Sequence, residues 1–410
     1  MLYKTIEKTS TLFNYIAILY VFVSVYYFMN LPGGGGDESL FVSDLQLIKN
    51  LGWHGAIVKN ISIPYMLLVY PLSFIMEEHI ALRMINIGLV LLLFLYFYYV
   101  GKIRSKSTYY YLLFFISTVG YFYFGTNDCL FFLSLIVFFN EVNNTVIDKN
   151  KNYNLALTAL IIAFFTRQLF LVYFPIIILG IYILHKSGFR ITTKSLVPLT
   201  VFIVFIFLNF PSIEQNGTLS FDKKEPPKEL GVTWSQRQYL AQLMVNKGQL
   251  ENGQHSSWED TKKYLEKNGK KSLPDGILNG ITLDYKLTIT EFFKDFAYSM
   301  IYSSRSLGLM LFFTLLYWFK GIKNNLNPPN IKFELKYFVP FATLIMVMIF
   351  SFIIISNVEL RWLSPVFVMT IVYYSELEQD GKFSKYFILS NNISLCLLSV
   401  YGIFRIFNKI

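Results

Sequence analysis

Long apolar runs follow one another along most of the chain and are separated by short polar segments. The runs are continuous, which is typical of helices that cross a bilayer, whereas transmembrane β-strands alternate apolar and polar residues. Hydrocarbon offers no partner for exposed peptide groups, so each run must be helical. The pattern predicts an all-α polytopic membrane protein with about 11 transmembrane helices, at residues 10–30, 79–101, 107–125, 127–142, 153–166, 168–186, 195–213, 296–319, 337–356, 360–376 and 386–405.

One further apolar segment, residues 61–76, does not fit this series. It contains Pro64 and Pro71 and runs directly into two glutamates, which leaves no room for a turn before the next span. We therefore interpret it as a helix that lies at the membrane interface. Residues 40–51 carry apolar positions at helical spacing and predict a second, amphipathic helix on the membrane surface.

The charged loops support this interpretation. If 61–76 does not span and the N-terminus is cytoplasmic, the loops rich in Lys and Arg all lie inside, as the positive-inside rule requires. These loops are residues 102–106, 148–151, 186–194, 320–336 and 376–385. If 61–76 spans, all of them lie outside. Arg405 and Lys409, near the C-terminal end, oppose the first scheme, because it places them outside.

The composition agrees with a membrane protein and narrows the function. Hydrophobic residues make up 54% of the chain and charged residues 15%, too few to cover a soluble protein of 410 residues. The net charge of +10 is explained by basic cytoplasmic loops rather than by nucleic-acid binding. The two cysteines, Cys129 and Cys396, lie in apolar runs and predict neither a disulfide framework nor a zinc site.

This threading divides the chain into an N-terminal transmembrane module, an extracytoplasmic loop or cap, and a set of C-terminal helices. The three parts comprise residues 1–213, with the first outer loop at 31–78, then 214–295 and 296–410. A short helix is predicted in the cap over 234–245. Trp234 and Trp258 of the cap suit either sugar stacking or anchoring at the membrane interface.

Acidic residues gather on the predicted outer face. Four glycines follow the first span and place the adjacent Asp37 and Glu38 at the membrane surface. A carboxylate there is suited to act as general base on an acceptor hydroxyl, or to hold a divalent cation (Mg²⁺ or Mn²⁺) through Asp37 and Asp128. Asp128 starts another span on the same face. The alternatives are a solvated loop for the first pair and a simple helix cap for Asp128.

Arginines accompany the acids on this face. Arg167 lies midway through a nearly continuous apolar stretch, where a charge is costly unless it faces a cavity or a partner. Arg361, two residues after Glu359, and Arg305 lie near the outer ends of later spans. Several guanidinium groups beside lipid suit a phosphate, which arginine holds with two hydrogen bonds. The alternative for Arg167 is a hairpin apex that snorkels to water.

In their order along residues 10–190, these features resemble the GT-C superfamily of membrane glycosyltransferases. Those enzymes transfer a sugar from a polyprenyl-phosphate carrier on the non-cytoplasmic side. An acidic pair follows the first helix, and the amphipathic helix and the proline-bearing segment around Tyr65 look like the family's jaw region. Residues 79–86, with Arg83 and Asn86, are similar to its alanine-x-arginine-x-x-asparagine helix.

Three later motifs extend the resemblance. Asn127-Asp128 matches the position of the family's second acidic site, and Arg361-Trp-Leu-Ser-Pro365 is similar to its late arginine-to-proline motif. Thr166-Arg167-Gln168 resembles the arginine-glutamine step of the eukaryotic glucosyltransferase that finishes the N-glycan precursor. The chain lacks the large C-terminal soluble domain and the sequon-reading tryptophan motif of oligosaccharyltransferases, which disfavours transfer of a whole oligosaccharide to asparagine.

The resemblance implies roles for individual residues. Asp37 would be the catalytic base or the carboxylate that orients the acceptor, supported by Glu38, with Asp128 as second acid. The carrier phosphate would be contacted by Arg167, Arg361 and Arg305. The further substrate-binding candidates are His54, Tyr65 and Glu359. The second acidic site has one acid rather than two, which leaves the metal requirement open.

The expected function is hexosyl or pentosyl transfer from a polyprenyl-phosphate carrier to a hydroxyl of a glycan or lipid-linked acceptor, with inversion. Two alternatives are a flippase or transporter of lipid-linked glycans and a glycan polymerase. The acidic pair directly after the first helix favours the transferase. The composition, rich in Lys and Asn, indicates a bacterium, so the expected location is the bacterial inner membrane with the active site facing outside.

Overall fold

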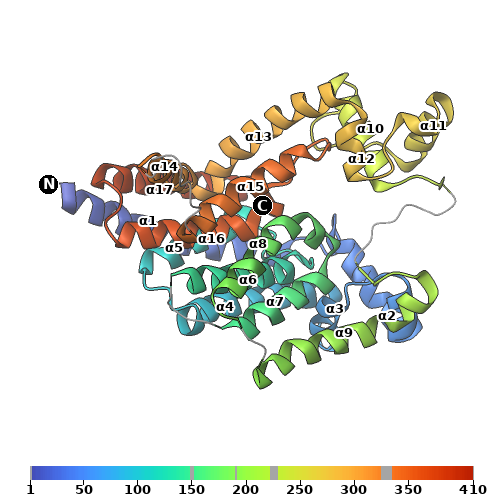
Figure 1. The fold of residues 1–410 in the computed structure, drawn as a ribbon, viewed down its shortest axis with the longest axis horizontal. Coiled ribbons are helices and arrows are strands. Elements are labelled where there is room, and N and C mark those ends of the chain that lie inside the picture. Colours follow the sequence, from blue (N-terminus) through green and yellow to red (C-terminus); the bar gives the residue numbers. More distant parts are fainter. Residues whose placement is uncertain (1, 148–151, 190–191, 222–229, 325–334, 410) are drawn as a thin grey trace. The chain divides into compact units, whose positions relative to one another are not determined.

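The computed structural model describes residues 2–147, 152–189, 192–221, 230–324 and 335–409. All regular secondary structure in these residues is helical, as predicted (Figure 1). The basic loop predicted at 148–151 and most of the one at 320–336 lie outside the described residues. Several helices are long and apolar enough to cross a bilayer, so the chain is a multi-pass membrane protein.

Six helices of the described chain meet the length and composition of a membrane span, or eight if each of two bent pairs counts as one span. The predicted number was about 11. The other three predicted runs form helices of 14, 14 and 16 residues, which are short for a crossing. These are α5 (Lys106–Val119), α7 (Tyr153–Thr166) and α16 (Ser364–Gln379).

Three of the six spans are single α-helices, and three combine an α-helix with a short 3-10 or π segment. They are α1 (Leu2–Asn30), α4 (Glu78–Leu95) with the π-helical η2 (Tyr96–Val100), α6 (Asp128–Val146), η3 (Gln168–Tyr173) with α8 (Phe174–Lys186), η7 (Leu335–Tyr337) with α15 (Phe338–Phe352), and α17 (Lys385–Phe407).

The span predicted at 296–319 is not one helix. Helix α13 (Tyr285–Leu307) and helix α14 (Met310–Asn324) meet at a bend of 117°. Gly308 adopts a φ of 55°, a conformation that glycine allows at little cost and that ends α13. The amide side chain of Asn391 accepts a 2.9 Å hydrogen bond from the Leu309 N–H, which the broken helix would otherwise leave without a partner.

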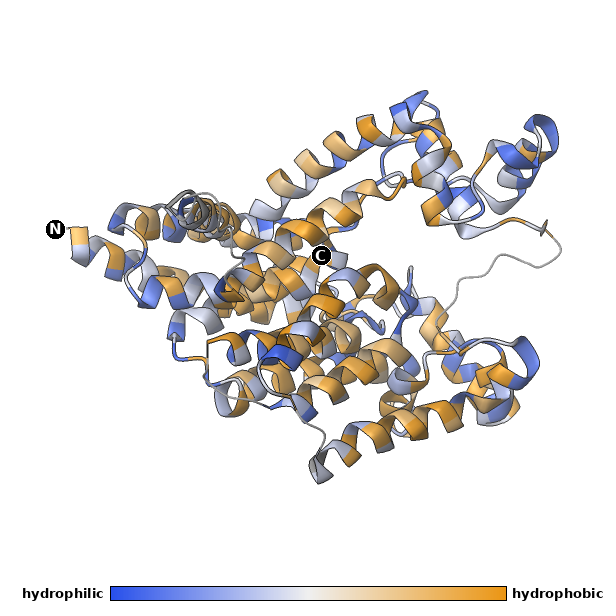
Figure 2. Ribbon diagram, in the orientation of Figure 1, coloured by the Kyte–Doolittle hydropathy of each residue, from blue (hydrophilic) through white to orange (hydrophobic). Residues whose placement is uncertain are grey.

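The second bent pair lies in α9 (Leu196–Asn216), which turns by 47° near Asn209. Pro211 lies inside this helix and removes one backbone hydrogen bond of its last turns. The outward face of α9 carries large apolar side chains, including Phe202 and Phe207, that are 40% and 77% exposed. Figure 2 shows that hydrophobic residues predominate along this helix. Such a face suits contact with lipid.

The segment 61–76 does not form a spanning helix, as predicted. It forms α3 (Ile63–Val69), seven residues long, and a single 3-10 turn, η1 (Leu72–Phe74). A seven-residue helix is about 10 Å long, a third of the hydrocarbon thickness. The amphipathic helix predicted at 40–51 is also present within α2 (Glu38–Val58), which buries Phe41, Leu45 and Ile48 and kinks at Gly52.

The chain forms two compact units. The first comprises residues 1–222, 303–343 and 364–410, and the second comprises 223–302 and 344–363. The predicted cap at 214–295 therefore corresponds to most of the second unit, which also takes in part of α15. The N- and C-terminal helices belong together, because α1 packs along both α17 and α5 (Figure 1).

Helix α6 forms the centre of the first unit. It is almost entirely buried and packs against α4, α7, α8 and α16. Apolar residues therefore occupy all sides of α6, rather than one face. The second unit has a small core between α10 (Trp234–Asn246), α11 (Trp258–Asn268) and the end of α15. Helix α10 confirms the helix predicted at 234–245, and α12 (Ile277–Leu283) completes this unit with the first part of α13.

Candidate active site

The glycine-rich loop after α1 is fixed by a buried ion pair. The guanidinium of Arg83 on α4 donates two hydrogen bonds to Glu38 at the start of α2, from Nε to Oε1 at 2.7 Å and from Nη2 to Oε2 at 2.6 Å. Both side chains are completely buried. This two-bond geometry is the strong form of the arginine–carboxylate interaction.

The remaining donors of Arg83 hold the loop itself. Its Nη1 donates to the carbonyl of Leu31 at 2.7 Å and its Nη2 to that of Pro32 at 3.2 Å. The backbone N–H of Gly34 donates to Glu38 Oε2 at 3.1 Å. The loop is thus wrapped around the ion pair, and a buried charge pair needs such additional hydrogen bonds to offset its desolvation.

The turn before α6 is attached to the same ion pair. The N–H of Gly125 donates to Glu38 Oε1 at 3.1 Å. A side chain at Gly125 would collide with Glu38 Oε1 and with Cβ of Leu82, so the approach requires glycine. Asn86, one turn after Arg83 on α4, donates its amide to the carbonyls of Phe124 at 2.5 Å and Thr126 at 3.0 Å.

A second carboxylate–guanidinium pair lies at the first residue of α6. Asp128 Oδ1 is ion-paired with Arg167, and its Oδ2 accepts a 3.2 Å hydrogen bond from the hydroxyl of Thr126. The Asp128 side chain is 1% exposed and that of Arg167 is 16% exposed. Arg167 has extended backbone between α7 and η3, which breaks the apolar stretch 153–185 in the middle.

The end of α7 joins a third segment to these two. The carbonyl of Thr166, the last residue of α7, accepts a hydrogen bond from Asn127 Nδ2 at 3.0 Å and one from the hydroxyl of Ser62 at 2.8 Å. Carbonyls at a helix end have no partner within the helix. Side chains before α6 and α3 therefore satisfy the one that α7 presents.

The structure thus brings together four predicted site residues, Asp37, Glu38, Asp128 and Arg167, within one hydrogen-bonded assembly. We call this assembly the junction; it comprises the loop 31–38, the turn 124–128 and the bend 166–167, with Arg83 and Asn86 of α4. Asp37 is the N-cap residue of α2 and is half-buried, next to the fixed Glu38. The three segments, which were predicted to share one membrane face, lie next to one another.

Of the other predicted residues, Tyr65 lies beside Glu38 and Asn86 of the junction, whereas His54 and Arg305 are exposed. Tyr65 is completely buried, packs against Phe41 with ring centroids 5.6 Å apart, and donates to the carbonyl of Leu82 at 3.3 Å, so the structure gives it a packing role. His54 is exposed on α2 beyond the Gly52 kink. Arg305 is exposed in the last turn of α13.

Arg361 and Glu359 belong to the second unit. The guanidinium of Arg361 is ion-paired with Glu359, and its side chain is buried within η8 (Leu360–Leu363). The adjacent Trp362 lies 5.8 Å from the ring of Phe350. Arginine and acid thus form a local pair, which the sequence analysis did not predict.

A divalent cation was predicted between Asp37 and Asp128, and Asp128 does not fit that role in this arrangement. Asp128 already faces the positive charge of Arg167, and Glu38 that of Arg83. Among the described residues no group of three or more His, Cys, Asp or Glu side chains lies close enough together to hold a metal ion. A hard cation such as Mg²⁺ needs several oxygen ligands, so we derive no catalytic step through a metal.

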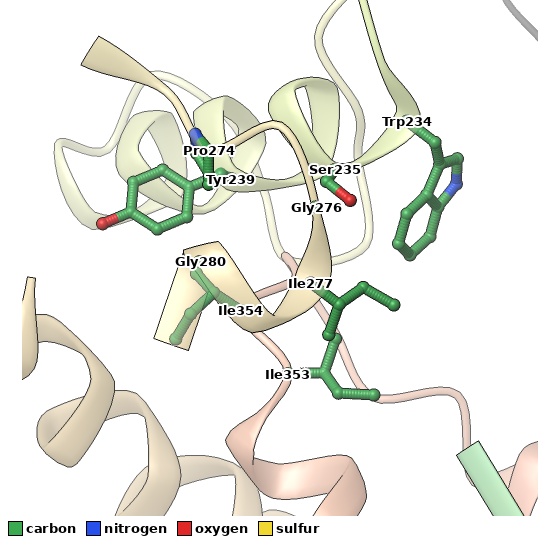
Figure 3. A pocket seen from close by; sticks show the side chains of 9 residues that line it. All are labelled: Trp234, Ser235, Tyr239, Pro274, Gly276, Ile277, Gly280, Ile353 and Ile354. Atoms are coloured by element: carbon green, nitrogen blue, oxygen red, sulfur yellow. The ribbon is translucent and has the colours of Figure 1, made fainter. Parts of the chain in front are cut away.

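The two tryptophans of the cap have different surroundings. Trp234 lines a small pocket with Tyr239, Ile277 and Ile353 in the second unit (Figure 3). Trp258 carries Arg237 over its ring, with the guanidinium carbon 4.5 Å from the centroid. Arg237 also donates to the Ser256 carbonyl at 2.6 Å, and partial burial lowers its pKa from the usual value. One face of Trp258 is therefore already occupied.

The sequence singled out the three acids and Arg167, and it placed Arg83 and Asn86 in a family motif without giving them a role. Arg83 was visible as a charge inside an apolar run, the same signal that marked Arg167. Gly125, Thr126 and Ser62 carry no comparable signal, because small and hydroxyl residues are common in any loop. Comparison of the chain with models of known protein families, with curated proteins and with solved structures finds no match.

Proposed function

We propose that this protein is a membrane glycosyltransferase of the GT-C type, which moves a sugar from a polyprenyl-phosphate carrier to a hydroxyl of a glycan or lipid-linked acceptor. The observation that carries the proposal is the junction. It holds a half-buried carboxylate, Asp37, and a partly exposed guanidinium, Arg167, in one fixed assembly of a multi-pass membrane protein. A base and an anion-binding group are what this transfer needs.

In the proposed reaction Asp37 removes the proton of the acceptor hydroxyl as its oxygen attacks the anomeric carbon. The bond between that carbon and the phosphate oxygen breaks, and the polyprenyl phosphate leaves with the electron pair. A single displacement of this kind inverts the anomeric configuration. No covalent intermediate and no cofactor is required, so the chain's own side chains supply the catalysis.

Arg167 is the proposed ligand of the carrier phosphate. Arg167 is paired with Asp128 and its side chain is 16% exposed, and the five N–H donors of a guanidinium form a fork that matches the geometry of a phosphate. Negative charge develops on the leaving phosphate in the transition state, so a fixed guanidinium there lowers the barrier. Asp128 then acts by orienting Arg167. Arg361, held by Glu359, and Arg305 remain proposed additional phosphate contacts on the strength of the sequence resemblance.

Glu38 keeps in this proposal the supporting part that the resemblance implied. Its two oxygens accept hydrogen bonds from Arg83 and from the N–H groups of Gly34 and Gly125, and the side chain is completely buried. A carboxylate so engaged is poorly placed to take a proton from an acceptor. We propose Glu38 as the positioning residue that fixes Asp37, with the extracytoplasmic face of a bacterial inner membrane as the location.

The direct test uses the purified protein in lipid vesicles with a panel of polyprenyl-phosphate hexoses and pentoses and a glycan acceptor. We expect release of free polyprenyl phosphate by the wild type and a loss of roughly 100-fold or more in Asp37→Asn, which cannot accept the proton. Asp44→Asn, on the same helix α2, is the matched control and should keep its rate.

Full activity in Asp37→Asn would end the assignment of the base. Movement of intact carrier lipid across the vesicle, without release of polyprenyl phosphate, would instead indicate the flippase. No turnover of any donor by the well-folded wild type would contradict transferase activity itself.

A further inference from the structure

A second polar cluster lies at the opposite end of α6 from the junction. Glu141 is completely buried in this helix, and Asn140 beside it is 1% exposed. At a rise of about 1.5 Å per residue, Glu141 lies about 20 Å along the axis from Asp128. The cluster is therefore separate from the junction, and a role for Glu141 does not depend on the proposed transfer reaction.

The direction of the hydrogen bonds in this cluster is fixed by chemistry. Asn140 Nδ2 lies 2.8 Å from the hydroxyl oxygen of Tyr96, and an amide nitrogen can only donate. The hydroxyl proton of Tyr96 therefore points to Glu141 Oε1, at 2.5 Å. Oε1 is an acceptor in this chain of bonds, so any proton on the carboxyl of Glu141 resides on Oε2.

The backbone at Tyr96 is shaped to form this contact. Tyr96 begins the π-helical turn η2, in which the N–H of Gly101 donates to the Tyr96 carbonyl at 2.8 Å. π turns are rare and frequently mark functional positions. A Cβ at Gly101 would come within 3.0 Å of Asn140 Nδ2, so glycine leaves space for the amide that orients Tyr96.

No cation neutralises Glu141 within the described residues. Oε2 is buried and has no hydrogen-bond partner there, and Tyr96 supplies the one hydrogen bond to Oε1. The next turn of the helix supplies no hydrogen bond to Glu141 either, because the amide nitrogen of Asn144 is itself buried without a partner among the described residues. An ionised carboxylate in such a place is far more costly than the neutral acid.

The elements packed against α6 offer no compensating charge. The charged side chain in the interior of α4 is Arg83, which is bound to Glu38. Helix α7 contains no charged residue. On the remaining elements the basic side chains are exposed, and the charged side chains of α16 are the acids Glu376 and Glu378, which supply no positive charge. The exposed basic residues are His185 and Lys186 of α8 and Lys336 of η7.

We propose that Glu141 is a proton-binding site of this protein, held as the neutral acid inside the helical bundle with its proton on Oε2. Tyr96 and Asn140 are the residues that position the carboxyl. The ligand of this site is thus a proton, and the site lies at the end of α6 remote from Asp128. Glu141 is also expected to be the carboxyl that a hydrophobic carbodiimide modifies, because such reagents attack protonated acids within a membrane.

The test compares the infrared spectra of the wild type and its variants, each purified and placed in lipid nanodiscs at neutral pH. We expect the wild type to show a carboxylic-acid C=O band that is lost in Glu141→Gln, a neutral side chain of the same shape. In Tyr96→Phe the band should persist and shift to higher wavenumber, because the hydrogen bond to Oε1 is removed. A merely structural carboxylate would show none of these changes.

Chemical labelling on the unmutated protein provides the second measurement. Dicyclohexylcarbodiimide should modify the peptide that contains Glu141, whereas a water-soluble carbodiimide should not. Absence of the acid band in the wild type, with a carboxylate band lost in Glu141→Gln, would overturn the proposal. Protection from labelling by Na⁺ would also overturn it and identify a cation site. Glu141→Gln should retain glycosyl transfer, so failure of either proposal leaves the other standing.

Discussion

At its N-terminal end α6 places Asp128 against the guanidinium of Arg167, whereas near its C-terminal end it places Glu141 against the phenol of Tyr96. Both carboxyl groups are buried in the same helix, so burial does not distinguish them. The difference is the partner. A guanidinium stabilises the ionised form, and a phenol with no cation nearby leaves the neutral acid as the less costly state. One helix can therefore present a fixed charge at one end and an exchangeable proton at the other.

The largest effect is expected from breaking the buried Arg83–Glu38 ion pair, which supports the N-terminal end of α6. Arg83→Met leaves the Glu38 carboxylate buried without its guanidinium and should lower the free energy of unfolding by about 3–5 kcal/mol. Thermal unfolding in detergent measures this loss. The double variant Glu38→Gln with Arg83→Met removes both charges and should recover part of it. Equal stability of Arg83→Met and the wild type would show that the pair contributes nothing.

The comparison itself is tested by neutralising each acid of α6 in turn. Asp128→Asn removes the charge that Arg167 faces and should cost about 1–3 kcal/mol of stability, less than a fully buried pair because Arg167 is partly exposed. Glu141→Gln replaces a neutral acid by a neutral amide and should cost less than about 1 kcal/mol. Chemical denaturation of the two variants side by side gives the difference. A larger loss in Glu141→Gln would reverse the assignment of the two ends.

Two glycines, one near each end of α6, allow the packing at the two ends to be compared. A methyl group at Gly125 meets Glu38 and Cβ of Leu82, which cannot move aside, so Gly125→Ala should cost about 1–3 kcal/mol. At Gly101 the nearest atoms to the methyl, the amide end of Asn140 and Cα of Phe97, lie at 3.0 and 3.3 Å, farther than those at Gly125, and the loss should be smaller. Gly35→Ala, in open space within the same loop as Asp37, is the control for the loss of glycine. The decrease in melting temperature should be largest for Gly125→Ala, smaller for Gly101→Ala and smallest for Gly35→Ala. A different order would contradict this explanation.

The helices could be predicted from the sequence because the apolar runs are long and continuous. Asp128 and Arg167 could be placed on one membrane face from the predicted topology alone, because each lies at the outer end of a predicted span. The support from Arg83 could not be predicted, because it pairs with Glu38 across a sequence separation of 45 residues and only the folded chain brings them together.

The break in the span at 296–319 was missed for a related reason. Gly308 is one glycine in an apolar run, and the amide of Asn391 that satisfies the freed N–H comes from α17, 82 residues further along. Glu141 was equally visible as a charge in the run 127–142, but its lack of a cationic partner is a property of the packed bundle. Local patterns predict helices, whereas the pairing of polar groups depends on contacts distant in sequence.

The carbonyl of Thr166 has a mechanical consequence for the assembly around it. A single oxygen atom receives hydrogen bonds from Ser62 and Asn127, so the entry to α3, the entry to α6 and the exit from α7 share one anchor. A shift of Thr166 strains both hydrogen bonds, whereas a shift of Ser62 or of Asn127 strains the one that it donates. Whatever occupies this face of the protein therefore meets three chain segments that respond cooperatively.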